Sequence, residues 1–326
     1  MTQSIKKIVV LSSGGDSPGM NAALRAVVRS AIHSKIKVYA SENGFSGLVQ
    51  ENLVPLNARS VANCIQRGGT ILKTSRSAEF RKKEVRDRVR AYLQQQQIDG
   101  IIVLGGNGSF TGAALLHQEG GPNVIGIPCT IDNDIYGTDY CIGFDTACNT
   151  ALEAIDKIRD TALSLDRNFI IEVMGRASGF IAVEVGIAVG AEYILIPEFP
   201  IALDKLAQHI KKQSGKKMAS IIVAAEADKP GHTFQLAEQL KERTDLDYRV
   251  CVLGHMQRGG TPSTRDRVMG TLMGAKAVDA VKAGQNGLMM AVQNGEIVAV
   301  PFPTPGATRY YDNLDNLEIN QIICQI

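Results

Sequence analysis

The stretch "IVVLSSGGDSPGMNAALRAVVRSAI", residues 8–32, decides how this chain folds. It begins with the short apolar run Ile8–Leu11 and continues through Gly14 and Gly15. It ends in Met20–Ile32, where apolar residues recur at the spacing of an amphipathic helix. A short apolar run followed by glycines and a helix is typical of a buried strand in a parallel sheet.

The same order of strand, glycine turn and helix repeats along the chain. Further strands are expected at Ile101–Leu104, Val124–Ile127, Phe169–Val173, Tyr193–Ile196, Ile221–Ala224 and Arg249–Leu253. Helices are expected at Lys83–Gln97, Thr146–Ser164, Leu203–Lys212 and Phe234–Arg243, and the tail from Pro301 reads as irregular and rich in turns. We therefore predict an α/β fold with two doubly wound parallel-sheet domains that are interleaved in sequence.

The overall composition fits a globular protein with a sizeable core and excludes several classes of function. The chain has 326 residues, of which 44% are hydrophobic and 21% charged, and its net charge is +2. This balance gives no reason to expect a nucleic-acid or membrane partner, so anion sites have to be built locally from Arg and Lys. No apolar run approaches the ~20 residues that span a bilayer, and residues 1–7 show no signal peptide. The six cysteines lack CxxC spacing, which argues against structural zinc and suggests reduced thiols in a cytosol.

Ligands of open α/β sheets bind beyond the carboxyl ends of the strands, so the residues that follow each strand matter most. After the first strand, Asp16 or Ser17 is expected to cap the helix, and amides at its N-terminus suit a phosphate, although a plain strand-to-helix turn would look the same. The stretch "GGNGS", residues 105–109, is a second glycine-rich turn whose amides suit a polyphosphate. It is not a P-loop, and its GxGxxxG spacing misses the dinucleotide fingerprint.

A carboxylate cluster follows the strand that ends near residue 127. Asp132 and Asp134 flank Asn133, and side chains of this kind serve a metal, a general base or a turn. The density of polar residues from 130 to 139 favours a site.

Basic residues follow several other strands. Arg176 lies in "EVMGRASG", and Glu226 follows another strand. A glycine pair near residue 259 is surrounded by Arg249, His255, Arg258, Arg265 and Arg267. This arrangement suits a pocket for a phosphate or a sugar hydroxyl. Arg25 and Arg29 share one helix face, either as a solvated surface or as an anion site, and Arg76 lies in a polar loop. Together these features predict a nucleotide-dependent phosphoryl transferase that uses Mg²⁺ and acts on a small phosphorylated substrate.

The motifs resemble those of the bacterial ATP-dependent 6-phosphofructokinase family over nearly the whole chain. The matching stretches are "GGDSPGMNA" (14–22), "GGT" (68–70), "GGNGS" (105–109), "TIDNDIYGTDY" (130–140), "EVMGRASG" (172–179), "PE" (197–198) and "GHMQRGG" (254–260). The resemblance implies transfer of the γ-phosphoryl group of ATP, with Mg²⁺, to the 1-hydroxyl of fructose 6-phosphate in glycolysis, by a cytoplasmic homotetramer. It also implies a larger ATP-binding domain of residues 1–142 and 257–305, and a smaller fructose 6-phosphate domain of residues 143–256 and 306–326.

The resemblance assigns roles residue by residue. Asp132 would be the general base, and the catalytic set would be Asp132, Thr130, Arg76 and Arg176. ATP would be held by Gly15, Arg76, Ser77, Gly106, Asn107, Gly108 and Ser109. Fructose 6-phosphate would be held by Thr130, Asp132, Asp134, Arg167, Met174, Gly175, Arg176, Glu226, Arg249, His255 and Arg258, with Arg167 and Arg249 donated by a neighbouring subunit. An effector, ADP or phosphoenolpyruvate, would meet Arg25, Arg29, Arg59, Arg159, Glu192 and one of Lys216 and Lys217.

The chain departs from the family pattern at several positions. The family usually has aspartate, acting on Mg²⁺, where this chain has Asn107, so weaker or water-mediated metal binding is expected. Gly108 matches ATP users, whereas pyrophosphate users typically have aspartate there, and Ser77 and Phe45 replace other residues near the adenine. The alternatives are a pyrophosphate-dependent phosphofructokinase and a catalytically weakened sugar-phosphate sensor. A lipid or NAD kinase and an NAD-dependent dehydrogenase fit the motifs less well.

Overall fold

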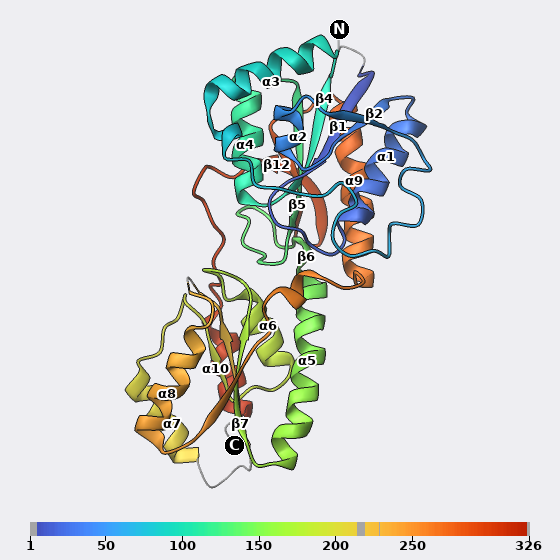
Figure 1. The fold of residues 1–326 in the computed structure, drawn as a ribbon. Helices are drawn as coiled ribbons and strands as arrows, with labels where there is room; N and C mark the ends of the chain where they lie inside the picture. Colours follow the sequence, from blue (N-terminus) through green and yellow to red (C-terminus); the bar gives the residue numbers. More distant parts are fainter. Residues whose placement is uncertain (1–4, 214–218, 228, 325–326) are drawn as a thin grey trace. The chain divides into compact units, whose positions relative to one another are not determined.

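The computed structural model describes residues 5–213, 219–227 and 229–324 (Figure 1). The chain forms two compact units. Unit 1 comprises Met1–Thr146 and Arg258–Arg309, and unit 2 comprises Ala147–Gln257 and Tyr310–Ile326. Each unit has its own sheet and is described by itself.

Unit 1 is built on an eight-stranded sheet in the order β12-β11-β5-β4-β1-β2-β3, with β6 paired to β5. Its strands are β1 (Lys7–Ser12), β2 (Lys37–Ser41), β3 (Leu53–Leu56), β4 (Gly100–Gly105), β5 (Asn123–Thr130), β6 (Ile142–Gly143), β11 (Leu288–Gln293) and β12 (Glu296–Pro301). Its helices are α1 (Met20–His33), α2 (Phe45–Val49), α3 (Lys83–Gln95), α4 (Asn107–Gln118) and α9 (Thr264–Lys282), with the short 3₁₀ turn η1 (Glu79–Arg81). All paired strands are parallel except β2 with β3 and β11 with β12.

Alternate residues of β1 show how both faces of this sheet are covered. Ile8 and Val10 belong to the core formed with α1 and α9, which lie side by side although they are far apart in sequence (Figure 1). Val9 and Leu11 belong to the core formed with α2, α3 and α4. Because successive side chains of a strand point to opposite faces, a strand that is covered on both sides has to be apolar throughout.

Unit 2 contains a four-stranded parallel sheet in the order β10-β7-β9-β8. Its strands are β7 (Asn168–Val173), β8 (Tyr193–Leu195), β9 (Ile221–Ala225) and β10 (Tyr248–Val252). Its helical segments are α5 (Phe144–Ser164, which starts in unit 1), α6 (Phe180–Ala188), α7 (Leu203–Gln213), α8 (His232–Thr244), η2 (Gly254–Arg258, whose last residue is in unit 1) and α10 (Leu314–Cys324). Leu206 and Leu240 bring α7 and α8 into one core with Ile222 of β9.

The start of α5 is fastened to α9 inside unit 1 by one buried carboxylate. Asp266 accepts hydrogen bonds from the Tyr140 hydroxyl (2.5 Å), from the backbone N–H of Gly143 (2.6 Å) and from both the N–H (2.9 Å) and the hydroxyl of Thr146. Burial raises the pKa of Asp266, and these donors oppose that shift. The contacts fix the point at which the chain leaves β6 and enters α5.

The predicted α/β fold class is confirmed, with corrections to particular elements. The strands β2, β3, β6, β11 and β12 and the helices α2, α4 and α9 were not predicted. The predicted cap of α1 is wrong, because Gly19 occupies the cap position with φ 99° and no side chain caps the helix. The tail is irregular only up to residue 313, where α10 follows. In the part of the chain that the structure describes, no helix has the length and apolar character needed to span a bilayer.

Candidate active site

The carboxyl ends of β1, β4 and β5 lie next to one another in the sheet of unit 1. From β1 the chain passes to β2 on one side, while β4 and β5 lie on the other side, so strand order reverses between β1 and β4. Such a reversal opens the crevice in which α/β proteins bind ligands. The loops on either side are tied together by the Ser13 N–H, which donates to the Leu104 carbonyl (2.9 Å).

The glycine-rich turn after β4 leads directly into α4. Gly106 is the cap residue, Asn107 is the first residue of the helix, and the N–H groups of Ser109 and Phe110 donate back to the Gly106 carbonyl. A side chain at Gly105 would collide with Ser109 and with the Ser13 carbonyl, at 2.6 and 2.7 Å. A Cβ on Gly108 would meet nothing within 4 Å, so the fold itself does not require glycine there. The open space beside the N-terminus of a twelve-residue helix suits an anion.

The loop after β1 is contacted by an arginine that is distant in sequence. A Cβ on Gly15 would lie 2.7 Å from Nη1 of Arg258, and the same Nη1 donates to the Asp16 carbonyl (3.1 Å). The sequence analysis assigned Arg258 to the sugar phosphate and Gly15 to ATP. The structure brings these two residues together in unit 1.

The loop of residues 67–76 closes another side of the β1 turn. Asn21, fully buried on α1, donates to the Arg67 and Gly68 carbonyls and accepts from the Ile71 N–H (2.8 Å). The Thr74 hydroxyl donates to the Gly14 carbonyl (2.9 Å). Arg76 follows with an exposed side chain. Asn21 therefore anchors this loop, a role that its place in the motif of residues 14–22 does not reveal.

The carboxylate cluster lies at the end of β5. Asp132 is 2% exposed, and its N–H donates to the hydroxyl of Thr130 (3.2 Å). Asn133, between the two aspartates, has a left-handed φ of 53°, which asparagine tolerates better than most residues. Its side chain accepts from the Cys141 N–H and donates to the Asp139 carbonyl, so it holds the following loop.

Asn107 and Asp134 are in direct contact. Nδ2 of Asn107 donates to the Asp134 carboxylate (3.1 Å) and to its backbone carbonyl (3.3 Å). Oδ1 of Asn107 is buried and has no hydrogen-bond partner among the described residues. Within those same residues, no group of three or more His, Cys, Asp or Glu side chains is arranged to hold a metal ion.

Two further residues near the nucleotide loops, Phe45 and Ser77, contact Phe80. Phe45 stacks on Phe80 with ring centroids 4.2 Å apart, and both rings are buried over Gly112. Ser77 accepts a hydrogen bond from the Phe80 N–H (3.3 Å). Phe45 is therefore a core residue rather than an exposed platform for a base.

In unit 2, the loop after β7 gathers four of the predicted substrate residues. Met174 and Gly175 are buried, and the exposed Arg176 has a left-handed φ of 52°. Glu226, which follows β9, accepts a hydrogen bond from the Arg176 N–H (3.0 Å). His255 lies on η2 with an exposed side chain.

Arg167 and Arg249 lie at the opposite end of the same sheet. Arg167 precedes β7, and Arg249 pairs with Phe169 at the start of that strand. Both side chains are exposed. Six residues of β7 separate this end from Met174, a distance of roughly 20 Å at the usual rise of a strand. The structure therefore does not bring these two arginines to the Arg176 loop of their own chain.

The predicted effector residues are divided between the units. Arg25, Arg29 and Arg59 belong to unit 1, where Arg25 and Arg29 lie close enough to the Cys64 thiol to oppose the rise in its pKa that burial causes. In unit 2, Arg159 donates to the Val189 and Gly190 carbonyls, and Glu192 accepts from the Ile221 N–H. Lys216 and Lys217 lie outside the described residues.

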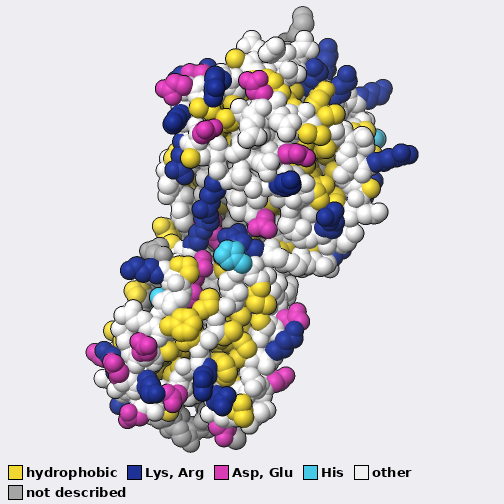
Figure 2. Space-filling model, viewed as in Figure 1, with side chains coloured by type: hydrophobic (Ala, Val, Ile, Leu, Met, Phe, Trp, Pro, Cys, Tyr) yellow, Lys and Arg dark blue, Asp and Glu magenta, His cyan; other side chains and the backbone are white. Residues whose placement is uncertain are grey.

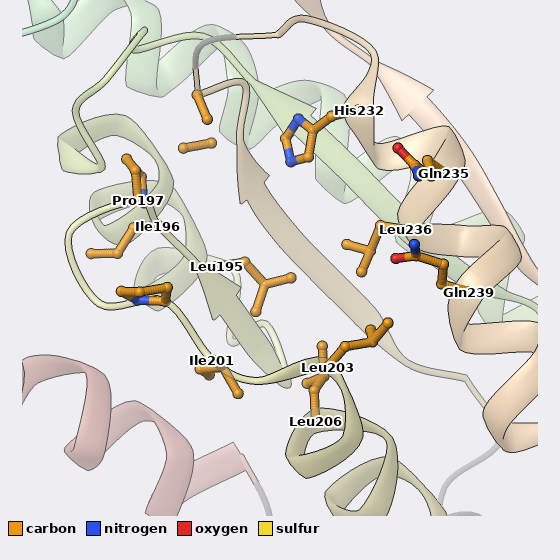
Figure 3. A pocket seen from close by; sticks show the side chains of 13 residues that line it. Leu195, Ile196, Pro197, Ile201, Leu203, Leu206, His232, Gln235, Leu236 and Gln239 are labelled. Carbon is orange, nitrogen blue, oxygen red and sulfur yellow. The ribbon is translucent and has the colours of Figure 1, made fainter.

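A cavity of about 330 Å³ lies elsewhere in unit 2, between the ends of β8 and β9 and helices α7 and α8 (Figure 3). Leucine, isoleucine and proline side chains form most of its wall, and His232, Gln235 and Gln239 enter it from α8. It contains none of the predicted site residues. On the molecular face in Figure 2, side chains of both charge signs are mixed, so anion sites have to be sought in local clusters.

The chain is similar to known proteins in both sequence and structure. The family model described as Phosphofructokinase matches residues 7–281. The chain is 65% identical to an ATP-dependent 6-phosphofructokinase of Coxiella burnetii, over 98% of both chains. It is 48% identical to ATP-dependent 6-phosphofructokinase 1 of Thermus thermophilus, over 98% of this chain and 99% of the relative.

Two solved structures share the fold. Phosphofructokinase from Saccharomyces cerevisiae superposes with a TM-score of 0.85 at 35% identity, covering 98% of this chain and 46% of that one. A pyrophosphate-dependent phosphofructokinase from Marinobacter aquaeolei superposes with a TM-score of 0.82 at 24% identity, covering 98% and 92%. The second likeness concerns the fold alone.

Proposed function

The chain belongs to the phosphofructokinase family, and we propose that it is an ATP-dependent 6-phosphofructokinase. In this proposal it transfers the γ-phosphoryl group of ATP to the 1-hydroxyl of fructose 6-phosphate, which gives fructose 1,6-bisphosphate in glycolysis. The two relatives named above carry that ATP-dependent activity in their names and match 98% of this chain.

The observation that carries the choice of ATP is the space at Gly108. Its Cβ position is open, beside the N-terminus of α4 and next to the loop after β1. An aspartate there would place negative charge at a helix N-terminus that suits phosphate oxygens. Glycine leaves room for a polyphosphate that continues into a nucleoside, and this favours ATP over pyrophosphate.

The proposed chemistry is direct transfer with Asp132 as general base. Asp132 accepts the proton of the 1-hydroxyl of fructose 6-phosphate. The oxygen of that hydroxyl attacks the γ-phosphorus of ATP, and the bond between the γ-phosphorus and the oxygen of the leaving ADP breaks. Thr130 supports this position, because its hydroxyl accepts the Asp132 N–H. Arg76 and Arg176 are both exposed, and in this proposal each supplies positive charge to phosphoryl oxygens.

Asn107 and Asp134 are the residues that would hold Mg²⁺. They fit the ion because both offer oxygen, the donor that Mg²⁺ prefers, and Oδ1 of Asn107 is buried without a partner in the described structure. Two protein ligands suffice when phosphates and waters supply the rest. When bound, the ion would neutralise developing charge on the phosphates.

The proposal includes a second copy of this chain, as a homotetramer. Arg167 and Arg249 are exposed at the end of the unit 2 sheet that lies away from Arg176. In this proposal they serve the sugar phosphate in the site of a neighbouring subunit. The corresponding test is the mass of the assembly by light scattering, where a monomer would remove these two residues from the site.

We further propose that ADP or phosphoenolpyruvate acts as an effector at a site between subunits, formed by Arg25, Arg29, Arg59, Arg159, Glu192 and one of Lys216 and Lys217. We also propose that the enzyme is cytoplasmic. Arg25 and Arg29 both act on the Cys64 thiol, so their positive charges lie in one region, which supports an anion site there. A shift of the fructose 6-phosphate saturation curve with either ligand is the expected result. An unchanged curve with both ligands removes the effector from the proposal.

The experiment that tests the function compares two phosphoryl donors. Initial rates of fructose 1,6-bisphosphate formation are measured with MgATP and with MgPPi in parallel. Turnover with MgATP alone is expected. Turnover with MgPPi alone would mean that Gly108 does not select the donor, and binding of fructose 6-phosphate without turnover would mean that the chain is a sensor.

A further inference from the structure

The loop Met174–Gly179 holds an unusual backbone conformation. Gly175 has φ 138° and Arg176 has φ 52°, so two consecutive residues occupy positive φ. A side chain at Gly175 would meet the Ser178 carbonyl at 2.5 Å. Such strained backbone conformations persist only when contacts with the surrounding structure hold them in place, and they cluster at functional sites.

Three side chains from three separate segments fasten this loop by its backbone. Oε1 of Gln257, on η2, accepts from the Met174 N–H (2.8 Å). Oε1 of Glu226 accepts from the Arg176 N–H (3.0 Å), and Oε1 of Glu198 accepts from the Gly179 N–H (2.9 Å). The acceptors lie 83, 50 and 19 residues away from the donors they hold, so the loop depends on the folded unit rather than on its own sequence.

Gln257 is the most deeply placed of the three. Its side chain is fully buried, at 0% exposure. The donor half of the amide, Nε2, is buried and finds no partner among the described residues. Because an unpaired buried donor is destabilising, the amide is retained at a cost, and the accepting half is the part that the folded chain uses.

Glu198 links the loop to the segment around Tyr311, which precedes α10. Its Oε1 accepts from the Tyr311 N–H (3.0 Å) as well as from Gly179, and the Tyr311 ring meets the edge of Phe180 at a centroid distance of 5.5 Å. A Cβ on Gly179 would lie 2.8 Å from Oε2 of Glu198, so the carboxylate is pressed against the loop.

We propose that Gln257 and Glu198 are positioning residues for sugar-phosphate binding, which hold the Met174–Gly179 loop in the one backbone conformation that presents Arg176. This inference rests on the proposed function. Neither residue has to touch the substrate: each acts through a backbone N–H at one end of the loop, while Glu226 holds its middle.

The test uses variants that keep or remove the accepting oxygen. Gln257→Met and Glu198→Met keep the side-chain length and remove the acceptor, whereas Gln257→Glu and Glu198→Gln keep an oxygen in place. Thr244→Val is the matched control, because Thr244 accepts from the Leu246 N–H (3.3 Å) in the same unit but far from the loop. For each protein, kcat and KM for both substrates, the melting temperature and hydrogen exchange in residues 174–179 are measured.

For the two methionine variants we expect KM for fructose 6-phosphate to rise about tenfold, the effect of losing roughly one hydrogen bond from a binding loop. We expect kcat and KM for ATP to stay within about twofold, exchange in the loop to accelerate, and the oxygen-keeping variants to restore wild-type KM. The Thr244→Val control should lower the melting temperature alone.

Three results would overturn the proposal. In the first, the methionine variants have lowered melting temperatures but an unchanged KM for fructose 6-phosphate. In the second, the methionine variants lose kcat alone. In the third, hydrogen exchange in residues 174–179 is no faster in the methionine variants than in Thr244→Val. If the wild-type protein does not phosphorylate fructose 6-phosphate, the proposed function fails. Hydrogen exchange still decides in that case, because it reports on the loop without turnover.

Discussion

Replacing Asn107 by aspartate tests whether the Asn107 amide limits the repulsion between negative charges around Asp134 in unit 1. In the wild-type chain Nδ2 of Asn107 donates to Oδ2 of Asp134 at 3.1 Å and to its carbonyl at 3.3 Å. Asn107→Asp has almost the same shape and puts an oxygen in place of that nitrogen. Two carboxylate oxygens and a carbonyl oxygen then face one another without a donor between them.

The expected destabilisation follows from these distances. Loss of a hydrogen bond to a charged group costs ~1.5–3 kcal/mol. Two unit charges about 3 Å apart repel by ~5 kcal/mol at an effective dielectric constant of about 20, and by about 1 kcal/mol in bulk water. Rotation of the side chains and uptake of a proton, which raises the pKa of one carboxyl, relieve part of this. A net loss of about 2–4 kcal/mol is expected, or roughly 3–6 °C in melting temperature for a protein of this size.

The assay is thermal unfolding in EDTA and over a magnesium titration. The variant should melt several degrees below wild type in EDTA and recover as Mg²⁺ is added, because an ion that binds only the folded state stabilises it. Wild type should respond less, since the amide already neutralises the contact. Asn107→Ala removes the donor without adding charge, so it should lose stability without gaining magnesium dependence.

A variant that melts at or above the wild-type temperature in EDTA would refute this reasoning. So would a magnesium response equal to that of wild type. Either result would mean that the contact between Asn107 and Asp134 does not set the charge balance of the site.

Three other predictions follow from contacts on the same chain. Asp132→Asn should lower kcat by ~10²–10⁴-fold with little change in melting temperature, and near-normal turnover would remove Asp132 as the base. Subunits that carry Asp132→Asn and subunits that carry Arg249→Ala should each be nearly inactive alone and should regain activity when they are unfolded and refolded together. The reason is that a mixed assembly contains sites with an intact Asp132 and a neighbour's intact Arg249. Activity no higher than the sum of the two would argue that Arg249 serves its own chain. The Arg86 guanidinium, through its hydrogen bonds to Glu119 (2.6 and 2.9 Å), lowers the pKa of that carboxyl. The stabilisation of the fold by this ion pair is therefore present above the pKa of Glu119 in the unfolded chain, near 4.3, and is lost as pH falls through the lower pKa in the folded chain. Glu119→Gln should be less stable than wild type at pH 7, and its melting temperature should fall less steeply as the pH is lowered.

Two strands of unit 1 that were predicted from sequence, β1 and β4, are buried on both faces. Residues 8–11 and 101–104 have no exposed side chain to interrupt the apolar run, so their pattern is legible without the fold. The strands β3 and β12 were missed because each lies at a sheet edge, pairs antiparallel to its neighbour and has partly exposed residues. Pro55 within β3 also reads as a strand breaker, and an edge strand tolerates it.

The helix α4 was missed for a different reason. Its sequence contains two glycines and begins in a glycine-rich turn, so local propensity argues against a helix. Tertiary contacts override that preference: Gly112 lies under the stacked rings of Phe45 and Phe80, where a Cβ would sit 3.4 Å from each. The same residues that weaken the helix in isolation let it pack closely and leave Gly108 open.

The division between what the sequence predicts and what it hides has a physical cause at the site itself. Residues proposed to meet ligands, such as Asp132 and Arg176, follow strands and are found by looking where strands end. The residues that hold the loops, Asn21 for residues 67–71 and Gln257 for Met174, act through contacts with segments 46 to 83 residues away, and no local pattern encodes such a contact. Both are buried amides with accepting oxygens bonded to loop N–H groups, and at such positions a substitution changes loop geometry while leaving every ligand-contacting side chain in place. Sequence comparison limited to the ligand-contacting residues would therefore score such a variant as intact, whereas a rise in KM would show that its loop is not.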